Sequence, residues 1–388
     1  MSTHFIAEHI KSIPFSGIRK FFDIANEMKD AVSLGVGEPD FFTPLHIREE
    51  AIKILEKTRT VYSSNAGMPE LKEEIARYLE RKYNISYQPE TQVVVTVGGS
   101  EGIDISLRAI INPGDEVLVV EPCFVSYKPC VIMAGGIPVV INTKAENQFK
   151  VMPEEIERAI TPKTKAIMIS YPSNPTGAVM NKEDLAKIVK VLENKDILVI
   201  TDEIYSELTY DKEPHVSIAS FESMKDKTIV LNGFSKAFAM TGWRLGYAAG
   251  PKELISAMIK IHQYAIMCAP TVSQYAAIEA LKNGDAAVQS MRQEYDTRRK
   301  LMLKGFKEIG MDCFEPLGAF YLFPSIQKSG LNSEDFCVTL LNTEKLAVVP
   351  GPAFGASGEG FIRCSYAYST ENLEAALERL GRFMRRYQ

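Results

Sequence analysis

The region from Gln92 to Gly250 alternates between short apolar runs and stretches of helical periodicity, and few folds accommodate such an alternation. The runs are rich in Val and Ile and lack polar alternation, which is typical of strands buried on both faces. Helices between them act as crossover connections and favour parallel strands. The runs are Gln92–Val97, Glu116–Glu121, Ile137–Ile141, Ala166–Ser170, Ile197–Thr201, Thr228–Leu231 and Tyr247–Ala249. The sequence therefore predicts an α/β fold with a mostly parallel sheet flanked by helices.

Elsewhere the predicted strands and helices are mixed rather than alternating. Helices are expected at Ile18–Met28, Pro44–Lys57, Pro69–Tyr83, Ser256–Met267, Ser273–Asn283, Ala286–Ile309 and from Thr370 onward. Strands are expected at Gly318–Phe323, Leu346–Val349 and Phe361–Tyr366. We therefore expect a large domain over residues 46–290. Residues 1–45 and 291–388 would form an N-terminal arm plus a small α+β C-terminal domain.

Composition narrows the class of protein. Of the 388 residues, 46% are hydrophobic and 24% are charged, as in ordinary soluble domains. The net charge of -5 gives no basic surface for nucleic acid. Six cysteines without a CxxC pair indicate free thiols in a reducing cytoplasm, and the five histidines have no metal-ligand spacing. Neither a signal peptide nor an apolar run long enough for a membrane span is evident, so we expect a cytoplasmic protein.

The stretch Phe234–Tyr247 follows the sixth apolar run and contains Lys236 and, eight positions later, Arg244. A lysine among apolar groups can lose its proton through desolvation, and the neutral amine can form a Schiff base with a carbonyl. The planar fork of an arginine matches a phosphate. An aldehyde and a phosphate in one cofactor indicate pyridoxal phosphate. A solvated surface lysine and a salt-bridged arginine would explain the same residues.

A second candidate site follows the first apolar run. Gly98, Gly99, Ser100 and Glu101 form a glycine-rich turn that opens a helix, predicted from Ile103. The backbone N–H groups and the positive end of the helix dipole in such a turn attract an anion. We therefore expect these four residues at the cofactor's phosphate. A tight strand-to-helix turn without any ligand is the commoner meaning of a glycine pair by itself.

Further polar residues follow other predicted strands. Asp202 follows a predicted strand, at the end of the strand where parallel sheets bind ligands. Its carboxylate could pair with a protonated ring nitrogen of the cofactor, and Tyr205 could reach the ring hydroxyl. Asn174 stands between two prolines and could donate to the same oxygen. The alternatives are a helix N-cap acid beside a packed tyrosine, and an Asx turn.

Two residues remain ambiguous by themselves. Phe124 could stack on a cofactor ring or belong to the core. Arg363 lies in an apolar strand, where a buried arginine needs a partner. A substrate carboxylate or an internal Asp or Glu would serve.

Together these motifs resemble the class I and II aminotransferases of fold type I, in the branch with bacterial aspartate and aromatic transaminases. The resemblance runs from Gly37–Phe41 to Phe361–Arg363 and is most specific in Ser235–Arg244. Asn174–Gly177 and Asp202–Tyr205 add to it.

The resemblance implies roles for the matching positions. Lys236 corresponds to the Schiff-base lysine and proton shuttle, Asp202 to the partner of the pyridine nitrogen, and Phe124 to the ring-stacking residue. Tyr205 and Asn174 correspond to partners of the ring hydroxyl. Phosphate contacts would come from Gly99, Ser100, Ser235 and Arg244, and α-carboxylate contacts from Gly37, Asn174 and Arg363. Tyr62 matches a tyrosine that reaches the neighbouring subunit's cofactor, which implies a homodimer with shared active sites.

The substrate is less constrained. The resemblance implies a ping-pong transaminase using an L-amino acid and a 2-oxo acid such as 2-oxoglutarate, and we favour aromatic or broad specificity. Aspartate, N-acetyl-diaminopimelate and carbon–sulfur β-elimination stay open, whereas a DNA-binding regulator is disfavoured because the first motif begins by Gly37. Tyr264, Phe320 and Tyr321 could line an aromatic pocket or belong to the core. Ile13–Arg19 could be a lid or a plain turn.

Overall fold

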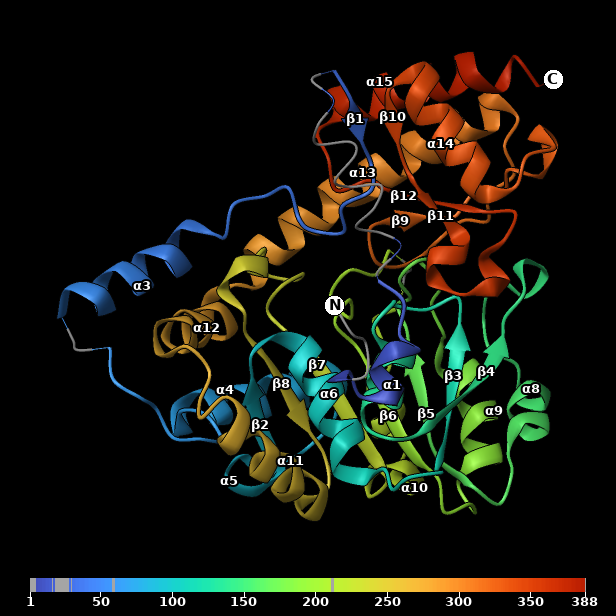
Figure 1. Cartoon of the computed structure of the whole chain (residues 1–388). Coiled ribbons are helices and arrows are strands. Elements are labelled where there is room, and N and C mark those ends of the chain that lie inside the picture. Colours follow the sequence, from blue (N-terminus) through green and yellow to red (C-terminus); the bar gives the residue numbers. More distant parts are fainter. Residues whose placement is uncertain are drawn as a thin grey trace.

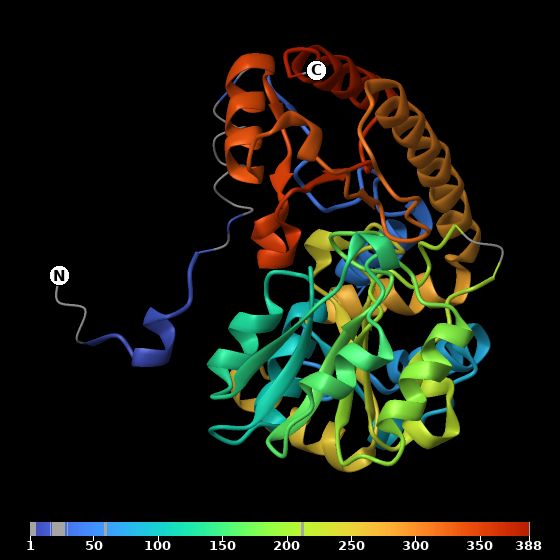
Figure 2. The same cartoon turned by 90° about the vertical axis from the view of Figure 1, so that its right-hand side faces the viewer.

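A computed structural model describes residues 5–15, 17, 28, 30–57, 60–210 and 213–387. The predicted helix Ile18–Met28 lies almost entirely outside these residues. Two bodies are visible, one around a large sheet and one formed mainly by the C-terminal third of the chain (Figure 1, Figure 2). In the described ranges no helix has the length and apolar character needed to cross a bilayer.

The large sheet has seven strands in the order β2-β8-β7-β6-β5-β3-β4. Their bounds are β2 Val93–Thr96, β3 Glu116–Glu121, β4 Ile137–Asn142, β5 Thr164–Ser170, β6 Leu198–Asp202, β7 Thr228–Gly233 and β8 Gly246–Ala249. All pairs are parallel except those of β8, which is antiparallel to β2 and β7. The link from β7 to β8 contains only a short 3₁₀ turn, Thr241–Trp243, and no crossover helix, so the chain returns antiparallel.

Helices cover both faces of this sheet (Figure 1). On one face α6 (Gly98–Ile110), α7 (Tyr127–Met133) and α11 (Lys252–Ala265) pack on residues such as Val117 and Val119. On the other, α8 (Pro153–Ala159) and α9 (Lys182–Leu192) pack on Leu118 and Val120. The expectation of strands buried on both faces is wrong for β4, because it is the sheet edge and exposes Ile137 and Val140.

Further helices surround the large sheet, and those at residues 69–83 and 271–283 pack on its Val93, Val95 and Val230. These further helices are α3 Leu45–Lys57, α4 Pro69–Tyr83, α5 Pro89–Gln92, α10 Glu222–Lys225 and α12 Thr271–Asn283, and a short α1 spans Glu8–Lys11. The long α13, Asp285–Ile309, leads from α12 into the second body (Figure 1).

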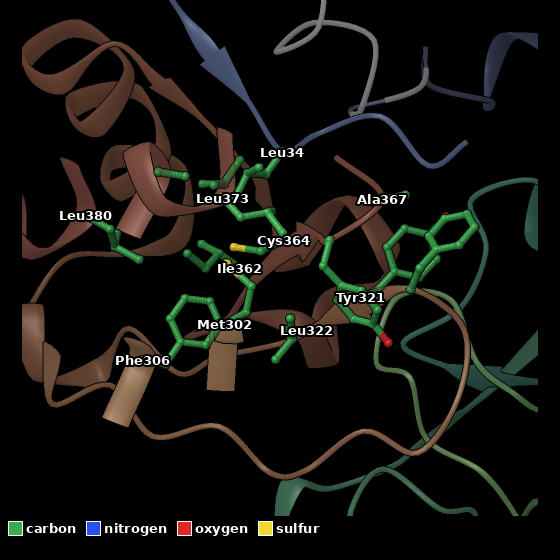
Figure 3. Close-up of a cluster of buried hydrophobic side chains, with 14 of the residues drawn as sticks. Leu34, Met302, Phe306, Tyr321, Leu322, Ile362, Cys364, Ala367, Leu373 and Leu380 are labelled. Atoms are coloured by element: carbon green, nitrogen blue, oxygen red, sulfur yellow. The ribbon is translucent and has the colours of Figure 1, made fainter. Parts of the chain in front are cut away.

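The second body contains two small sheets. One pairs β1 (Val32–Ser33) with β10 (Leu346–Ala347), and the other has the order β11-β12-β9. The remaining bounds are β9 Tyr321–Leu322, β11 Val349–Pro350, β12 Ile362–Ser365, α14 Ser333–Glu344 and α15 Thr370–Met384. Its apolar core includes Met302, Phe306, Leu322, Ile362 and Leu380 (Figure 3). Pairing of β1 with β10 ties the N-terminal segment to this body.

Candidate active site

A cavity of about 630 Å³ lies at the carboxyl ends of the sheet strands. On one side the cavity is lined by residues at the ends of β2, β5, β6 and β7 and in the segments after them. On the other side it is lined by the N-terminal segment and β12. Of the residues predicted for the site, the lining includes Gly37, Gly99, Ser100, Phe124, Asn174, Asp202, Tyr205, Ser235, Lys236, Arg244 and Arg363. Residues from both bodies therefore meet where open α/β sheets bind ligands.

The amine of Lys236 is buried in this cavity. Its Nζ donates a hydrogen bond to the carbonyl oxygen of Gly37 at 2.6 Å. Burial lowers the pKa of Lys236 to about 8; the Glu38 carboxylate opposes this shift, and Arg363 and Arg244 reinforce it. A substantial neutral fraction near pH 7 to 8 makes this amine a nucleophile toward a carbonyl.

This lowered pKa predicts how the cofactor-free protein reacts with pyridoxal phosphate. Because the pKa of Lys236 falls to about 8, the neutral amine predominates above that pH. Below it the amine fraction, and with it the rate of covalent capture, should fall about tenfold for each pH unit. Rapid mixing followed by borohydride trapping measures this rate. An inflection near pH 10.5, the usual lysine value, would contradict the burial effect.

The carboxylate of Asp202 ends β6 and is almost fully buried. It accepts hydrogen bonds from the Tyr127 hydroxyl at 2.7 Å and from the Ile204 backbone N–H at 3.2 Å. Burial raises the pKa of Asp202, and these two hydrogen bonds act in the opposite direction. Such a carboxyl group is prepared to pair with a cation that enters the cavity.

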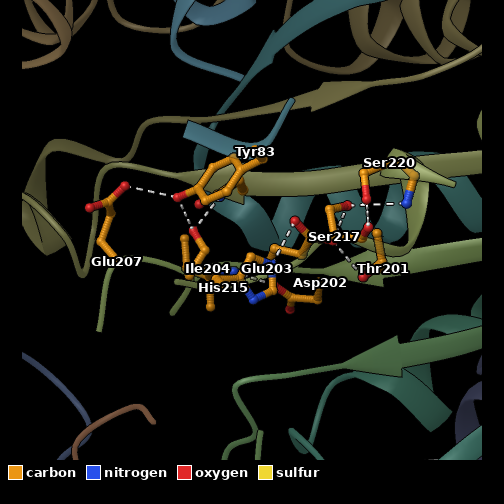
Figure 4. Close-up of polar contacts among 12 residues, drawn as sticks. Tyr83, Thr201, Asp202, Glu203, Ile204, Glu207, His215, Ser217 and Ser220 are labelled. Atoms are coloured by element: carbon orange, nitrogen blue, oxygen red, sulfur yellow. Dashed lines mark hydrogen bonds and ion pairs between the residues drawn. The ribbon is translucent and has the colours of Figure 1, made fainter. Parts of the chain in front are cut away.

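A buried polar network holds the turn after β6 (Figure 4). Glu203 accepts from Thr201 Oγ1 at 3.0 Å and from Ser217 Oγ at 2.6 Å, and lies 3.0 Å from His215 Nε2. The Tyr83 hydroxyl donates to Ser206 at 2.7 Å. These contacts restrain the turn from both sides, so Asp202 and Tyr205 keep their orientation toward the cavity.

Arg363 is buried on β12 and donates to Asn174 Oδ1 at 2.9 Å and to the Gly35 carbonyl at 2.5 Å. Its guanidinium lies over the rings of Tyr321 and Phe354, 4.5 and 4.7 Å from their centroids. The described residues supply no carboxylate partner, and Arg363 Nε has no hydrogen-bond partner among them. An external carboxylate would satisfy this buried cation.

At the other end of the cavity, α6 meets Arg244. The helix begins at Gly98, five residues before the predicted start, so the glycines form its first turn. Gly98 has φ +73°, and a Cβ there would lie 2.6 Å from Arg244 Nη2, so only glycine fits. Arg244 also donates to the Thr241 carbonyl at 3.0 Å. With the hydroxyls of Ser100 and Ser235, this end offers donors for a phosphate.

Three residues predicted at the cofactor do not line the cavity. Gly98 lies behind Arg244. Glu101 accepts from the Val97 N–H at 2.5 Å and pairs with the buried His262 Nδ1 at 2.6 Å, so its carboxylate is engaged away from the cavity. Tyr62 is 79% exposed on the surface.

The structure also adds residues that the sequence reasoning did not assign. Tyr127, Glu38, Thr241 and Gly35 line the cavity. Of the proposed aromatic pocket, Tyr321 lines the cavity, Phe320 is buried in the core and Tyr264 is exposed. No local sequence pattern predicts a place for Tyr127 at the site, because its hydrogen-bond partner Asp202 is 75 positions away. Of the candidate lid Ile13–Arg19, only residues 13–15 and 17 are described.

The donor set fits pyridoxal phosphate. A buried amine of lowered pKa, a buried carboxylate and a cluster of phosphate donors face one cavity. The described residues contain no group of His, Cys, Asp or Glu that could hold a metal ion. The lining can therefore bind an aldehyde covalently, a phosphate electrostatically and a carboxylate through Arg363.

Comparison with known proteins agrees with this chemistry. The family model "Aminotransferase class I and II" matches residues 29–380. A putative aminotransferase of Bacillus subtilis is 53% identical, covering 98% of this chain and 99% of its own. An aspartate aminotransferase of Pyrococcus abyssi is 47% identical (95% and 96% covered), and aromatic-amino-acid aminotransferase 2 of Thermococcus litoralis is 43% identical (98% of each).

A solved structure extends the match to three dimensions. The crystal structure of Pyrococcus protein-A1 superposes with a TM-score of 0.96 at 46% identity and covers 98% of each chain. The fold is also that of solved aminotransferases, such as the aspartate aminotransferase from Thermus thermophilus with a TM-score of 0.93 at 39% identity, covering 97% of this chain and 99% of its own. The chain belongs to the class I and II aminotransferases, and it is an enzyme that uses pyridoxal phosphate to transfer amino groups.

Proposed function

We propose that this transaminase moves the amino group of aromatic, or broadly varied, L-amino acids to a 2-oxo acid such as 2-oxoglutarate by a ping-pong route. One observation carries the preference. The cations that line the described part of the cavity are Lys236, Arg244 and Arg363. Each has a task at the imine, the phosphate or the α-carboxylate, so none is dedicated to the side chain of the amino donor, and the distal carboxylate of 2-oxoglutarate would depend on donors outside this lining. The aromatic rings of Phe124, Tyr205 and Tyr321 line the same space.

The residues are proposed to act as follows. Bound pyridoxal phosphate supplies an aldehyde and an electron-poor ring that accepts the charge left on Cα. Arg363 binds the α-carboxylate and holds Cα near Lys236, which supplies proximity. The neutral Lys236 amine would take the proton from Cα and deliver it to the C4′ carbon of the cofactor, so that the amino group stays on the cofactor when the 2-oxo acid leaves. Asp202 keeps the ring nitrogen protonated.

The remaining groups bind and orient. Gly99, Ser100, Ser235 and Arg244 are proposed to hold the phosphate, with Gly98 and Glu101 supporting the turn from behind. Phe124 is proposed to stack on the ring, and Asn174 and Tyr205 to donate to its hydroxyl. Asn174 accepts from Arg363 through Oδ1, so its NH₂ group is the half of the amide suited to donate.

A panel of amino donors tests the proposed specificity. Phenylalanine, tyrosine, tryptophan, aspartate, alanine and cysteine would each be paired with 2-oxoglutarate, and the ring absorbance followed in each half-reaction. We expect the aromatic donors to have the highest kcat/KM. Aspartate far above the aromatic donors would overturn the proposal. Release of pyruvate and ammonia from cysteine would instead indicate β-elimination.

Aspartate is the second candidate donor. The observation in its favour is that the relative from Pyrococcus abyssi, 47% identical, is an aspartate aminotransferase. The distal carboxylate of aspartate, like that of 2-oxoglutarate, would need a donor outside the described lining, for example from a partner subunit. The same panel separates the two donors.

Arg363→Lys should weaken the binding of every amino donor. Lysine retains the charge but loses the planar fork and leaves the Asn174 and Gly35 oxygens poorly paired. We expect the half-saturation concentration in the half-reaction to rise by roughly 30-fold or more, in line with loss of a buried charged hydrogen bond. Stopped-flow absorbance provides the measurement. Arg385→Lys, at an exposed position near the C-terminus, is the matched control. An unchanged half-saturation concentration would contradict the assignment.

We also propose a homodimer with shared active sites. Helix α3 exposes Leu45, Ile52 and Leu55, and the following loop exposes Val61 and Tyr62. Exposed large apolar side chains concentrated in one segment are typical of an interface. We propose a cytoplasmic location, which the free thiols support. We also propose one domain over residues 46–290 and another formed by residues 1–45 and 291–388, which the distribution of the sheets supports.

Tyr62→Phe tests the shared site. If the hydroxyl of Tyr62 reaches the partner's phosphate, its loss should raise the dissociation constant for pyridoxal phosphate by roughly 3- to 10-fold. Equilibrium dialysis measures this constant, and Tyr264→Phe, at another exposed tyrosine, is the control. A monomer in sedimentation analysis, or equal retention in both variants, would refute subunit sharing.

A further inference from the structure

Tyr321 connects two parts of the cavity that have separate tasks. Tyr321 is the first residue of β9. It is only 1% exposed, yet it lines the cavity. It lies at the edge of the apolar cluster of the second body, with its hydroxyl directed away from that cluster (Figure 3). Its hydroxyl oxygen lies 2.8 Å from that of Tyr205, and its ring supports the Arg363 guanidinium at 4.5 Å.

The backbone is shaped to admit this side chain. A Cβ at Gly37 would collide with the Tyr321 hydroxyl, so position 37 has to be glycine. The Gly37 carbonyl accepts the hydrogen bond from Lys236. Tyr321 therefore contacts Arg363 through its ring and Tyr205 through its hydroxyl. Through Gly37 it is also linked to the Lys236 amine.

The distance between the two tyrosine hydroxyl oxygens allows either of them to donate, so the surrounding charges decide the direction of the hydrogen bond. Each hydroxyl has one hydrogen, and burial raises the pKa of both, so both remain protonated near neutral pH. The Arg363 guanidinium acts to lower the pKa of both hydroxyls but lies directly over the Tyr321 ring, 4.5 Å from its centroid, and this contact favours Tyr321 as the donor. The charged groups facing the pair are Arg363, Asp202, Lys236 and Glu38.

We infer that Tyr321 is a positioning residue that donates its hydroxyl hydrogen to Tyr205, leaves the Tyr205 hydrogen to the cavity, and supports the Arg363 guanidinium with its ring. The inference rests on the roles of Tyr205 and Arg363 in the proposed function. Hydrogen bonds in a chain polarise one another, so donation by Tyr321 strengthens donation by Tyr205 to the ring oxygen. One side chain thereby couples cofactor orientation to substrate binding.

Two substitutions separate the hydroxyl from the ring. Tyr321→Phe keeps the ring and removes the hydroxyl, so the pKa read from the absorbance of bound pyridoxal phosphate should rise by roughly 0.3 to 0.6. The half-saturation concentration for the amino donor should stay within about twofold. Tyr321→Met removes the ring as well and should raise that concentration by roughly 3- to 30-fold, the range of a desolvated cation–π contact.

A double-mutant cycle gives the decisive result. Tyr205→Phe should raise the absorbance pKa more than Tyr321→Phe, and the double substitution should add no further rise. If Tyr205→Phe shifts the pKa and Tyr321→Phe does not, the inference about Tyr321 is wrong and the role of Tyr205 stands. If neither variant shifts it, the role of Tyr205 in the proposed function fails. An additive double variant would also overturn the coupling. Melting of the cofactor-free variants checks folding separately.

Discussion

Lys236→Ala should abolish transamination while leaving the fold intact. The side chain is buried at the cavity, and the proposed nucleophile and proton shuttle are the same amine. Loss of acid–base catalysis alone costs about 10²–10⁴ in rate, and the Schiff-base linkage is lost as well, so we expect kcat to fall by at least about 10⁴. The substitution also removes a partly charged buried amine, so the cofactor-free protein should not be less stable than the parent near pH 7.

Two measurements test this prediction: the rate of turnover and the covalent trapping of the cofactor. Borohydride reduction of the parent protein should trap a pyridoxyl group on the tryptic peptide that contains Lys236, and the variant should trap none. Lys252→Ala, at an exposed lysine on α11, is the matched control and should behave as the parent does. Turnover of an amino acid by Lys236→Ala at a rate near that of the parent would refute the assignment.

Asp202→Asn should cause the second-largest loss. The asparagine keeps the shape and can still accept from Tyr127 and Ile204, but it has no charge to hold a proton on the ring nitrogen. Removing one preorganised electrostatic contact in a buried site costs about 10²–10³ in kcat. We expect a decrease of that size, because the carbanion is then poorly delocalised.

Two variants make this test specific. Tyr127→Phe removes one hydrogen bond from Asp202 and keeps its charge, so kcat should fall by about tenfold or less. Asp196→Asn replaces an exposed carboxylate with no path to the cavity and should leave kcat unchanged. If Asp202→Asn retained more than half of the parent's kcat, the proposed pairing with the ring nitrogen would be wrong.

The strands were predictable because each is a continuous apolar run closed by Gly, Pro or a polar residue. Glu116–Glu121 is reproduced residue for residue, and the other six large-sheet strands differ by one or two residues at their ends. The order and direction of these strands were harder to predict from the sequence. The antiparallel β8 follows from the short connection after Lys236, and the exposed face of β4 follows from its edge position. Both depend on neighbours distant in sequence.

The same distinction applies to the site. Lys236, Asp202 and Asn174 were predictable because Asp202 ends an apolar strand and the other two closely follow one, each within a local motif. Glu101 was assigned to the cofactor from the same kind of motif, but its carboxylate pairs with His262, 161 positions away. Tyr127 was missed because its role comes from a contact across the sheet.

The sequence by itself determined the chemical groups of this enzyme and their order: an amine after one strand, a carboxylate after another, and a glycine turn with an arginine for phosphate. Those are local properties of strands and turns. Only the tertiary structure decided how those groups act. Burial lowers the pKa of Lys236 to about 8 and raises that of Asp202, and the packing of β9 and β12 seats Tyr321 between Tyr205 and Arg363. Desolvation and close contact are set by neighbours from remote parts of the chain, so no local pattern encodes them.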